Sequence, residues 1–306
     1  MLPPSSSPSP PFAPFAPNPP TSPAPLRIAI VQPVMHWSGN DNTCAVLAAI
    51  ETAAAAGAQL CLFPELAVTG FHRQIAAQAQ PALVSGWMQA IEAACARHAI
   101  AASVGVPTFG DDPAKKIFNS QVFIDTRGQR LATVHKTGLT DPEATFFTRG
   151  DSLSDSRPVS GSVSRPVVTL LGQRISAVIC REIEDLDAVC AQWAAEMTPA
   201  MPHAMPNPMP QIIVWPGLMS PDPDKPPTDP PWHVQDAQRL ARRTGAFVLQ
   251  ANWPMSLNDP DRSAKTGASV VIGPDGNINF TLPEAAAGLG VFTLGATTFE
   301  WHADET

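Results

Sequence analysis

Three segments of this 306-residue sequence share a pattern in which an apolar strand ends at a side chain that can do chemistry. The first, LCLFPELAVTGF, places Glu65 just beyond its strand. The second, ATVHKTGLTDPE, places Lys136 at a strand end and Glu143 seven residues later. The third, AVICREIED, switches from apolar residues to charge at Cys180. Residues beyond the carboxyl ends of strands in an α/β protein collect at one rim, so we expect these side chains to meet there.

A thiol, a carboxylate and an ammonium group have complementary roles in nucleophilic catalysis. A cysteine thiol is mostly protonated at neutral pH, so it needs a base or a neighbouring cation before it can attack. Glu65 can accept that proton and later deliver it to a leaving amine. Lys136 can hold the thiolate by charge and stabilise an oxyanion. The electrophile that such a set serves is a carbon that bears nitrogen, as in an amide, a carbamoyl group or a nitrile.

The same segments resemble the motifs of the nitrilase or carbon–nitrogen hydrolase superfamily, which has a Glu–Lys–Cys triad. FPELAVTGF is similar to its first motif, HKTGLTDPEATFFTRGD to its lysine motif and ICREIED to its cysteine motif. Each motif alone is a weak signal, but all three in order, each at a strand end, are a strong one. The resemblance covers roughly residues 26–294. It implies an α/β fold, a four-layer α-β-β-α sandwich with two mixed β-sheets.

The resemblance also implies a role for each matching residue. Glu65 would be the general base, Lys136 the partner of the oxyanion and the thiolate, and Cys180 the nucleophile. Glu143 matches a second carboxylate that positions the substrate and the lysine. The backbone N–H of Arg181 would be the second oxyanion donor.

The sequence departs from the family pattern around the cysteine. Arg181 stands where the family usually has an aromatic residue or an acid, and Phe71 stands where a tyrosine is common. The usual R-F-P-E continuation is replaced by Ile183, Glu184 and Asp185. The Arg181 side chain either binds an acidic group of the substrate or pairs with one of the acids that follow it. These departures affect the substrate pocket and the subfamily.

We therefore expect a hydrolase that cleaves the C–N bond of a small amide or carbamoyl compound through a cysteine thioester. A nitrilase that acts on a small nitrile is an alternative, because the interval from Lys136 to Glu143 suits nitrile-acting members, although CREI does not resemble their cysteine motif. A catalytically inactive binding or scaffold protein is the alternative from another class. No metal or other cofactor is expected, since the sequence has neither a Cys-x-x-Cys pair nor a His-x-x-x-His spacing.

Other cysteines and two tryptophans have structural interpretations. Cys61 ends an apolar strand with no cation nearby, which favours core packing. Cys44 and Cys95 fall within helical patterns and are also expected to pack. Trp215 and Trp253 either line a pocket or lie buried in the core.

The chain alternates between strand and helix patterns, and a hairpin-rich second half favours mixed strand pairing. Asp41 or Asn42 is the expected N-cap of the first helix. Helices are expected at 41–58, 82–98, 185–197 and 230–246. Strands are expected at 27–33, 60–63, 99–107, 117–125, 130–136, 166–170, 174–179, 212–216, 247–253, 267–273, 277–282 and 288–294.

Composition excludes several classes of function. The net charge of −8 without a basic cluster argues against a nucleic-acid partner. No stretch approaches the ~18 apolar residues of a membrane span. The five unpatterned cysteines suit a reducing cytoplasm. Residues 1–25, with eleven prolines and no charge, are expected to form a disordered tail before a single domain at 26–300. The Met- and Pro-rich segment 197–211 is either a surface insertion, a lid or an oligomer contact.

The helix that follows the cysteine strand has an apolar stripe at helical spacing. The stripe consists of Leu186, Val189, Cys190, Trp193 and Met197. It either faces the sheet of its own subunit or forms a dimer face. Members of the resembled superfamily commonly pair in this region, so at least a homodimer is expected.

Overall fold

The computed structural model describes residues 25–113, 115–152, 165–195, 209–219, 226, 228–261 and 266–304. The tail predicted for residues 1–25 lies outside the described residues except for Pro25. Most of the Met- and Pro-rich segment at 197–211 lies outside them as well.

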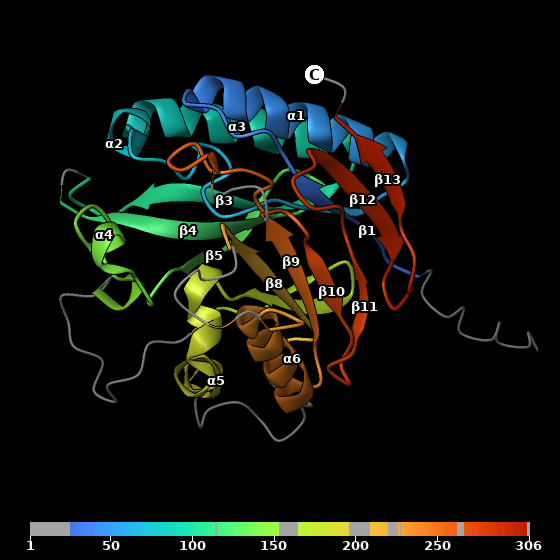
Figure 1. Cartoon of the computed structure of the whole chain (residues 1–306). Coiled ribbons are helices and arrows are strands. Elements are labelled where there is room, and N and C mark those ends of the chain that lie inside the picture. The colour runs from blue at the N-terminus through green and yellow to red at the C-terminus, as the bar shows by residue number, and fades with distance from the viewer. Residues whose placement is uncertain are drawn as a thin grey trace, which may run out of the picture.

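Two mixed β-sheets lie face to face in the middle of the molecule (Figure 1). The seven-stranded sheet has the strand order β13-β12-β1-β2-β3-β4-β5. Its parallel centre is β1, β2 and β3, and the remaining pairs are antiparallel. Its strands are β1 (Arg27–Gln32), β2 (Leu60–Leu62), β3 (Ala101–Phe109), β4 (Ile117–Ile124), β5 (Arg130–His135), β12 (Gly288–Thr293) and β13 (Glu300–Ala303).

The six-stranded sheet has the strand order β11-β10-β9-β8-β7-β6. Here β7, β8 and β9 are parallel, and antiparallel strands flank them on both sides. Its strands are β6 (Val168–Leu170), β7 (Gln173–Ala177), β8 (Ile212–Gly217), β9 (Phe247–Asn252), β10 (Val270–Ile272) and β11 (Ile278–Thr281).

Helices cover the outer face of each sheet, which completes the predicted four-layer α-β-β-α sandwich (Figure 1). Over the seven-stranded sheet lie α1 (Gly39–Ala55) and α3 (Pro81–His98), and over the six-stranded sheet lie α5 (Leu186–Ala195) and α6 (Trp232–Thr244). The shorter helical segments are α2 (Ile75–Gln78), α4 (Asp141–Ala144) and the 3-10 turns η1 (Gly150–Ser152) and η2 (Cys180–Glu184). In the described part of the chain, no helix is long and apolar enough to cross a membrane.

The core explains why the strands read as continuous apolar runs. Ile28 and Ile30 of β1 belong to the cluster that fills the space between the two sheets and continues beneath α5 and α6. Ala29 and Val31 point the other way, into the cluster beneath α1 and α3. Both faces of the sheet are therefore buried, so the sequence does not alternate between apolar and polar residues.

The predicted helices and strands are present, with shifted ends and three additions. The N-cap of α1 is Ser38, whose hydroxyl accepts from the Asp41 N–H at 3.3 Å. The side chain of Asn42, one of the two predicted caps, instead bonds both backbone groups of His36. The short helices α2 and α4 and the edge strand β13 were not predicted.

The apolar stripe on α5 faces its own subunit, which is one of the two placements expected for it, and not a dimer face. The Trp193 side chain is fully buried in its own subunit, and its indole N–H donates to the Ser176 hydroxyl at 3.0 Å. Val189 is buried in the same hydrophobic cluster as Trp193, and Leu186 and Cys190 pack against this cluster. The stripe therefore faces the six-stranded sheet, and the homodimer stays a prediction without this surface. Met197 lies outside the described residues.

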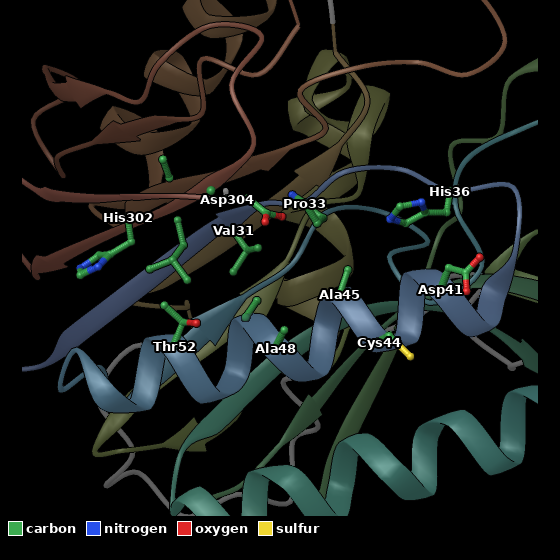
Figure 2. A pocket seen from close by; sticks show the side chains of 14 residues that line it. Val31, Pro33, His36, Asp41, Cys44, Ala45, Ala48, Thr52, His302 and Asp304 are labelled. Carbon is green, nitrogen blue, oxygen red and sulfur yellow. The ribbon is translucent and has the colours of Figure 1, made fainter. Parts of the chain in front are cut away.

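The cysteine interpretations are confirmed at two positions and wrong at one. Cys61 and Cys95 are buried, whereas Cys44 is exposed. Cys44 lines a cavity of about 660 Å³ between α1 and the strands β12 and β13 (Figure 2). None of the predicted catalytic residues lines this cavity, which lies on the outer side of the seven-stranded sheet.

Candidate active site

Glu65 follows β2 in a turn that is packed on its neighbours. The side chain is fully buried, and the indole N–H of Trp253 donates to the Glu65 backbone carbonyl at 2.8 Å. On β3, a Cβ at Gly105 would lie 2.3 Å from the Pro64 carbonyl oxygen and from the Leu66 nitrogen. Only glycine therefore allows the β3 backbone to support this turn so closely.

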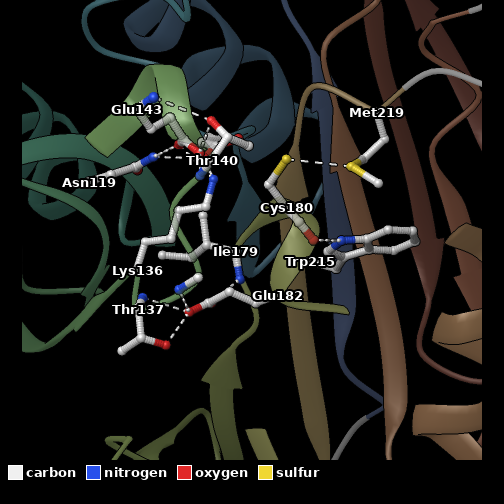
Figure 3. Close-up of polar contacts among 12 residues, drawn as sticks. Asn119, Lys136, Thr137, Thr140, Glu143, Ile179, Cys180, Glu182, Trp215 and Met219 are labelled. Carbon is white, nitrogen blue, oxygen red and sulfur yellow. Dashed lines mark hydrogen bonds and ion pairs between the residues drawn. The ribbon is translucent and has the colours of Figure 1, made fainter. Parts of the chain in front are cut away.

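Lys136 extends β5 by one hydrogen bond, from its N–H to the Asn119 carbonyl at 2.8 Å. Its fully buried ammonium group donates to Glu65 Oε1 and to Glu143 Oε1, each at 2.7 Å (Figure 3). The structure thus brings together three of the predicted site residues from segments that are far apart in the sequence.

The two oxygens of the Glu143 carboxylate have different partners, one in the cap of α4 and the other at Lys136. Its Oε2 accepts from the Thr140 N–H at 2.9 Å and from the Thr140 hydroxyl at 3.0 Å, which forms a capping box at the start of α4. The other oxygen, Oε1, faces Lys136. The cap fixes the carboxylate, so the lysine is held by an immobile acceptor.

Asn119 is a site residue that the sequence analysis missed. Its buried side-chain amide on β4 donates to Glu65 Oε1 at 2.7 Å and to Glu143 Oε1 at 3.1 Å. The available signal was the polar run Asn-Ser-Gln inside an otherwise apolar strand, because a buried polar side chain needs a partner.

Cys180 is the first residue of η2 and approaches the cluster from the other sheet. It is buried and has a positive φ of 53°, a conformation that is uncommon for residues other than glycine and is found at functional sites. The indole N–H of Trp215 donates to its carbonyl at 3.0 Å, and its sulfur lies 3.4 Å from the Met219 sulfur (Figure 3).

Trp215 and Trp253 therefore belong to the core rather than to a pocket wall, since both are fully buried. Each uses its one polar atom to hold a backbone carbonyl, Cys180 in one case and Glu65 in the other. Trp215 lies in β8 and Trp253 directly follows the neighbouring strand β9, so both tryptophans anchor the main chain from the side of the six-stranded sheet.

The surroundings of Cys180 favour the protonated form of its thiol. Burial raises the pKa of Cys180, the negative Glu65 raises it further, and the positive Lys136 lowers it only in part. Burial also raises the pKa of Glu65, with Lys136 and Asn119 opposing. Burial lowers the pKa of the Lys136 ammonium, but the facing acidic groups, Glu65 first, outweigh burial and raise it. The site thus combines a permanent cation with a carboxyl group that binds protons readily.

The Arg181 side chain lies at the surface, where its guanidinium is 3.9 Å from the Glu184 carboxylate. This geometry favours the pairing interpretation over a contact with an acidic substrate. The backbone N–H of Arg181 lies near the start of η2, where N–H groups lack partners within the turn. Among the described residues, no three His, Cys, Asp or Glu side chains come together in a way that could hold a metal ion.

Comparison with solved structures supports the fold. An amidase from Nesterenkonia sp. is similar with a TM-score of 0.69 and 22% identity, over 89% of this chain and 91% of that one. A mutant of the Nesterenkonia sp. AN1 amidase, with acrylamide added at its active-site cysteine, gives a TM-score of 0.68 and 23% identity, over 87% and 92% of the two chains. Another mutant, described as from the nitrilase superfamily, gives 0.69 and 22%, over 89% and 92%. At this identity the likeness shows the fold.

The class of protein that the fold and the family comparison define is that of the carbon–nitrogen hydrolases. The family model described as carbon-nitrogen hydrolase matches residues 27–302, so the chain belongs to that family. The comparison with curated proteins finds no match.

Proposed function

We propose that this enzyme hydrolyses the C–N bond of a small amide or carbamoyl compound through a thioester on Cys180. The observation that carries the proposal is the buried ammonium group of Lys136, held between the carboxylates of Glu65 and Glu143 beside a buried thiol. A cysteine that only packs in the core requires no charged groups beside its thiol.

In the first half of the proposed reaction, Glu65 takes the thiol proton and the Cys180 sulfur attacks the carbonyl carbon. Negative charge develops on the carbonyl oxygen, where the Lys136 ammonium and the Arg181 N–H stabilise it. Glu65 then donates its proton to the nitrogen as the C–N bond breaks. The amine or ammonia departs and leaves the thioester.

In the second half, Glu65 accepts a proton from water while the water oxygen attacks the thioester carbon. The C–S bond breaks, the thiol regains its proton from Glu65, and the acid is released. Glu65 Oε2 suits both halves, because it is buried and has no hydrogen-bond partner among the described residues while Oε1 faces Lys136.

The test is release of ammonia from a panel of short amides, ureido acids and nitriles, with Cys180→Ala as the blank. The proposal expects turnover of an amide or a ureido acid that the blank lacks. Turnover of nitriles alone would replace it with the nitrilase alternative. No turnover across the panel, with the thiol intact, would support a binding or scaffold protein.

A further inference from the structure

Glu182 lies two residues after Cys180, and its buried carboxylate joins the two segments that carry the lysine and the cysteine. On the cysteine side, Oε2 accepts from the Ile179 N–H at 2.8 Å. On the lysine side, Oε1 accepts from the N–H and the hydroxyl of Thr137, at 2.7 and 2.8 Å (Figure 3). Ile179 immediately precedes Cys180, and Thr137 immediately follows Lys136.

These two segments belong to different sheets. Thr137 follows β5 of the seven-stranded sheet, and Ile179 follows β7 of the six-stranded sheet. Backbone ladders hold each sheet together, but no ladder crosses from β5 to β7. A single carboxylate therefore supplies hydrogen bonds across the boundary at the place where the site residues meet.

Arg165 balances the charge of this carboxylate. Its guanidinium donates to both Glu182 oxygens, at 2.8 and 3.1 Å, and is almost fully buried. It also donates to Gln192 Oε1 at 2.8 Å, and the Gln192 amide donates to the Thr137 hydroxyl at 3.1 Å. The four side chains form a closed ring of hydrogen bonds.

A buried ion pair of this kind is weak evidence for stability, because the cost of desolvation offsets much of the attraction. Its value lies in fixed geometry, since donors from four residues, Thr137, Gly138, Arg165 and Ile179, hold the carboxylate in one orientation. Within the described residues, the hydrogen bonds of Glu182 go to Arg165 and to groups flanking the site, and none goes to the Lys136 ammonium or the Cys180 thiol.

We propose that Glu182 is a positioning residue for the reaction, which with Arg165 fixes the Lys136 ammonium relative to the Cys180 sulfur across the boundary between the sheets. The proposal deepens the proposed function and rests on it for the chemistry. Its geometric part concerns the resting protein and can be measured without a substrate.

The readout is the pH dependence of Cys180 alkylation by iodoacetamide in the intact protein. The charged groups that face this thiol are Glu65, Lys136 and Glu143, and Lys136 is the one that eases its ionisation. If Glu182→Gln lets the lysine move away, the alkylation profile shifts to higher pH, by about one unit. Removing a negative charge without movement would shift the profile to lower pH, so the sign separates the two roles.

Thr137→Val provides a second variant that changes no charge. It removes one hydroxyl contact to Glu182 and is expected to shift the profile in the same direction by less, whereas Thr137→Ser leaves it unchanged. Glu184→Gln, in the same turn but at the surface, is the matched control. If Glu182→Gln does not fold, the test is the difference between the alkylation profiles of Thr137→Val and Thr137→Ser.

With a substrate from the panel, Glu182→Gln is expected to lower kcat on the order of a hundredfold with little change in KM, as misplacement of catalytic groups does. A profile that is unchanged or shifted to lower pH in the folded variants overturns the proposal. An upward shift in a protein that turns over no substrate supports the positioning role and counts against the proposed function, so the two failures are distinguishable.

Discussion

At the scale of single residues, the buried cysteines Cys180 at the start of η2 and Cys61 within β2 give a matched pair. Cys180→Ala is expected to abolish ammonia release and leave the melting temperature nearly unchanged, because it removes one sulfur atom from a residue that is 7% exposed. Cys61→Ala is expected to keep most of the activity but to lower the free energy of unfolding by about 1 kcal/mol, since Cys61 is fully buried in the cluster beneath α1 and α3. Activity within tenfold of wild type in Cys180→Ala would contradict the nucleophile assignment.

Lys136→Met is expected to lower kcat on the order of a thousandfold, as loss of an oxyanion donor does. It also leaves the buried Glu65 carboxylate without its cation, so burial raises the pKa of this carboxyl group in the folded state further above the unfolded value of about 4.3. A carboxyl group with a raised folded pKa costs stability once the pH exceeds its unfolded pKa. The melting temperature of the variant should therefore fall between about pH 5 and pH 8, more steeply than that of the wild type.

Lys115→Met is the control for this pH dependence, because the Lys115 side chain is 81% exposed and its ion pair lies at the surface. Its melting curve should follow that of the wild type across the same range. A flat curve for Lys136→Met would mean that the carboxylates find other partners.

At the scale of elements, the end of β8 shapes the space beside the nucleophile. Asn252 holds Met219 by both backbone groups, each at 2.8 Å, so the thioether is fixed against the Cys180 sulfur. We expect an acyl group on the sulfur to lie against this side chain, so Met219→Ala enlarges the space for it. The ratio of kcat/KM for butyramide over acetamide is expected to rise about tenfold, which corresponds to one or two methylene groups in an apolar pocket.

Met88→Ala on α3 is the matched control, since Met88 is buried in the cluster beneath α1 and α3, away from the site. It should lose stability without changing the substrate ratio. An unchanged ratio in Met219→Ala would show that the acyl group lies elsewhere.

The elements also show how far sequence reasoning reaches. Glu65, Lys136 and Cys180 were predicted because each ends a strand, which is a local pattern. Asn119 and the Glu182–Arg165 pair were missed because their partners lie in other segments of the chain, and only the folded structure brings these segments together. The stripe on α5 was read correctly as apolar, but periodicity alone cannot say which surface covers it.

At the scale of the whole molecule, the first residue that joins the core is Leu26, which packs in the cluster between the sheets. Deletion of residues 1–25 therefore removes no core side chain among the described residues. The truncated protein is expected to keep the activity and melting temperature of the full chain, measured side by side. A fall of more than a few degrees in the melting temperature would contradict the prediction of an uninvolved tail.

Because the site residues come from both sheets, enzymatic activity depends on how the two sheets are packed against each other. The lysine and both carboxylates belong to one sheet and the sulfur to the other, while side-chain packing and the Glu182 ring connect them. In some proteins a denaturant disrupts side-chain packing at a lower concentration than it unfolds the hydrogen-bonded strands, which gives a loosely packed intermediate state. In a urea titration, enzymatic activity should vanish at a lower concentration than the far-ultraviolet circular dichroism signal. Coincident midpoints would mean instead that the sheets separate and unfold in a single event.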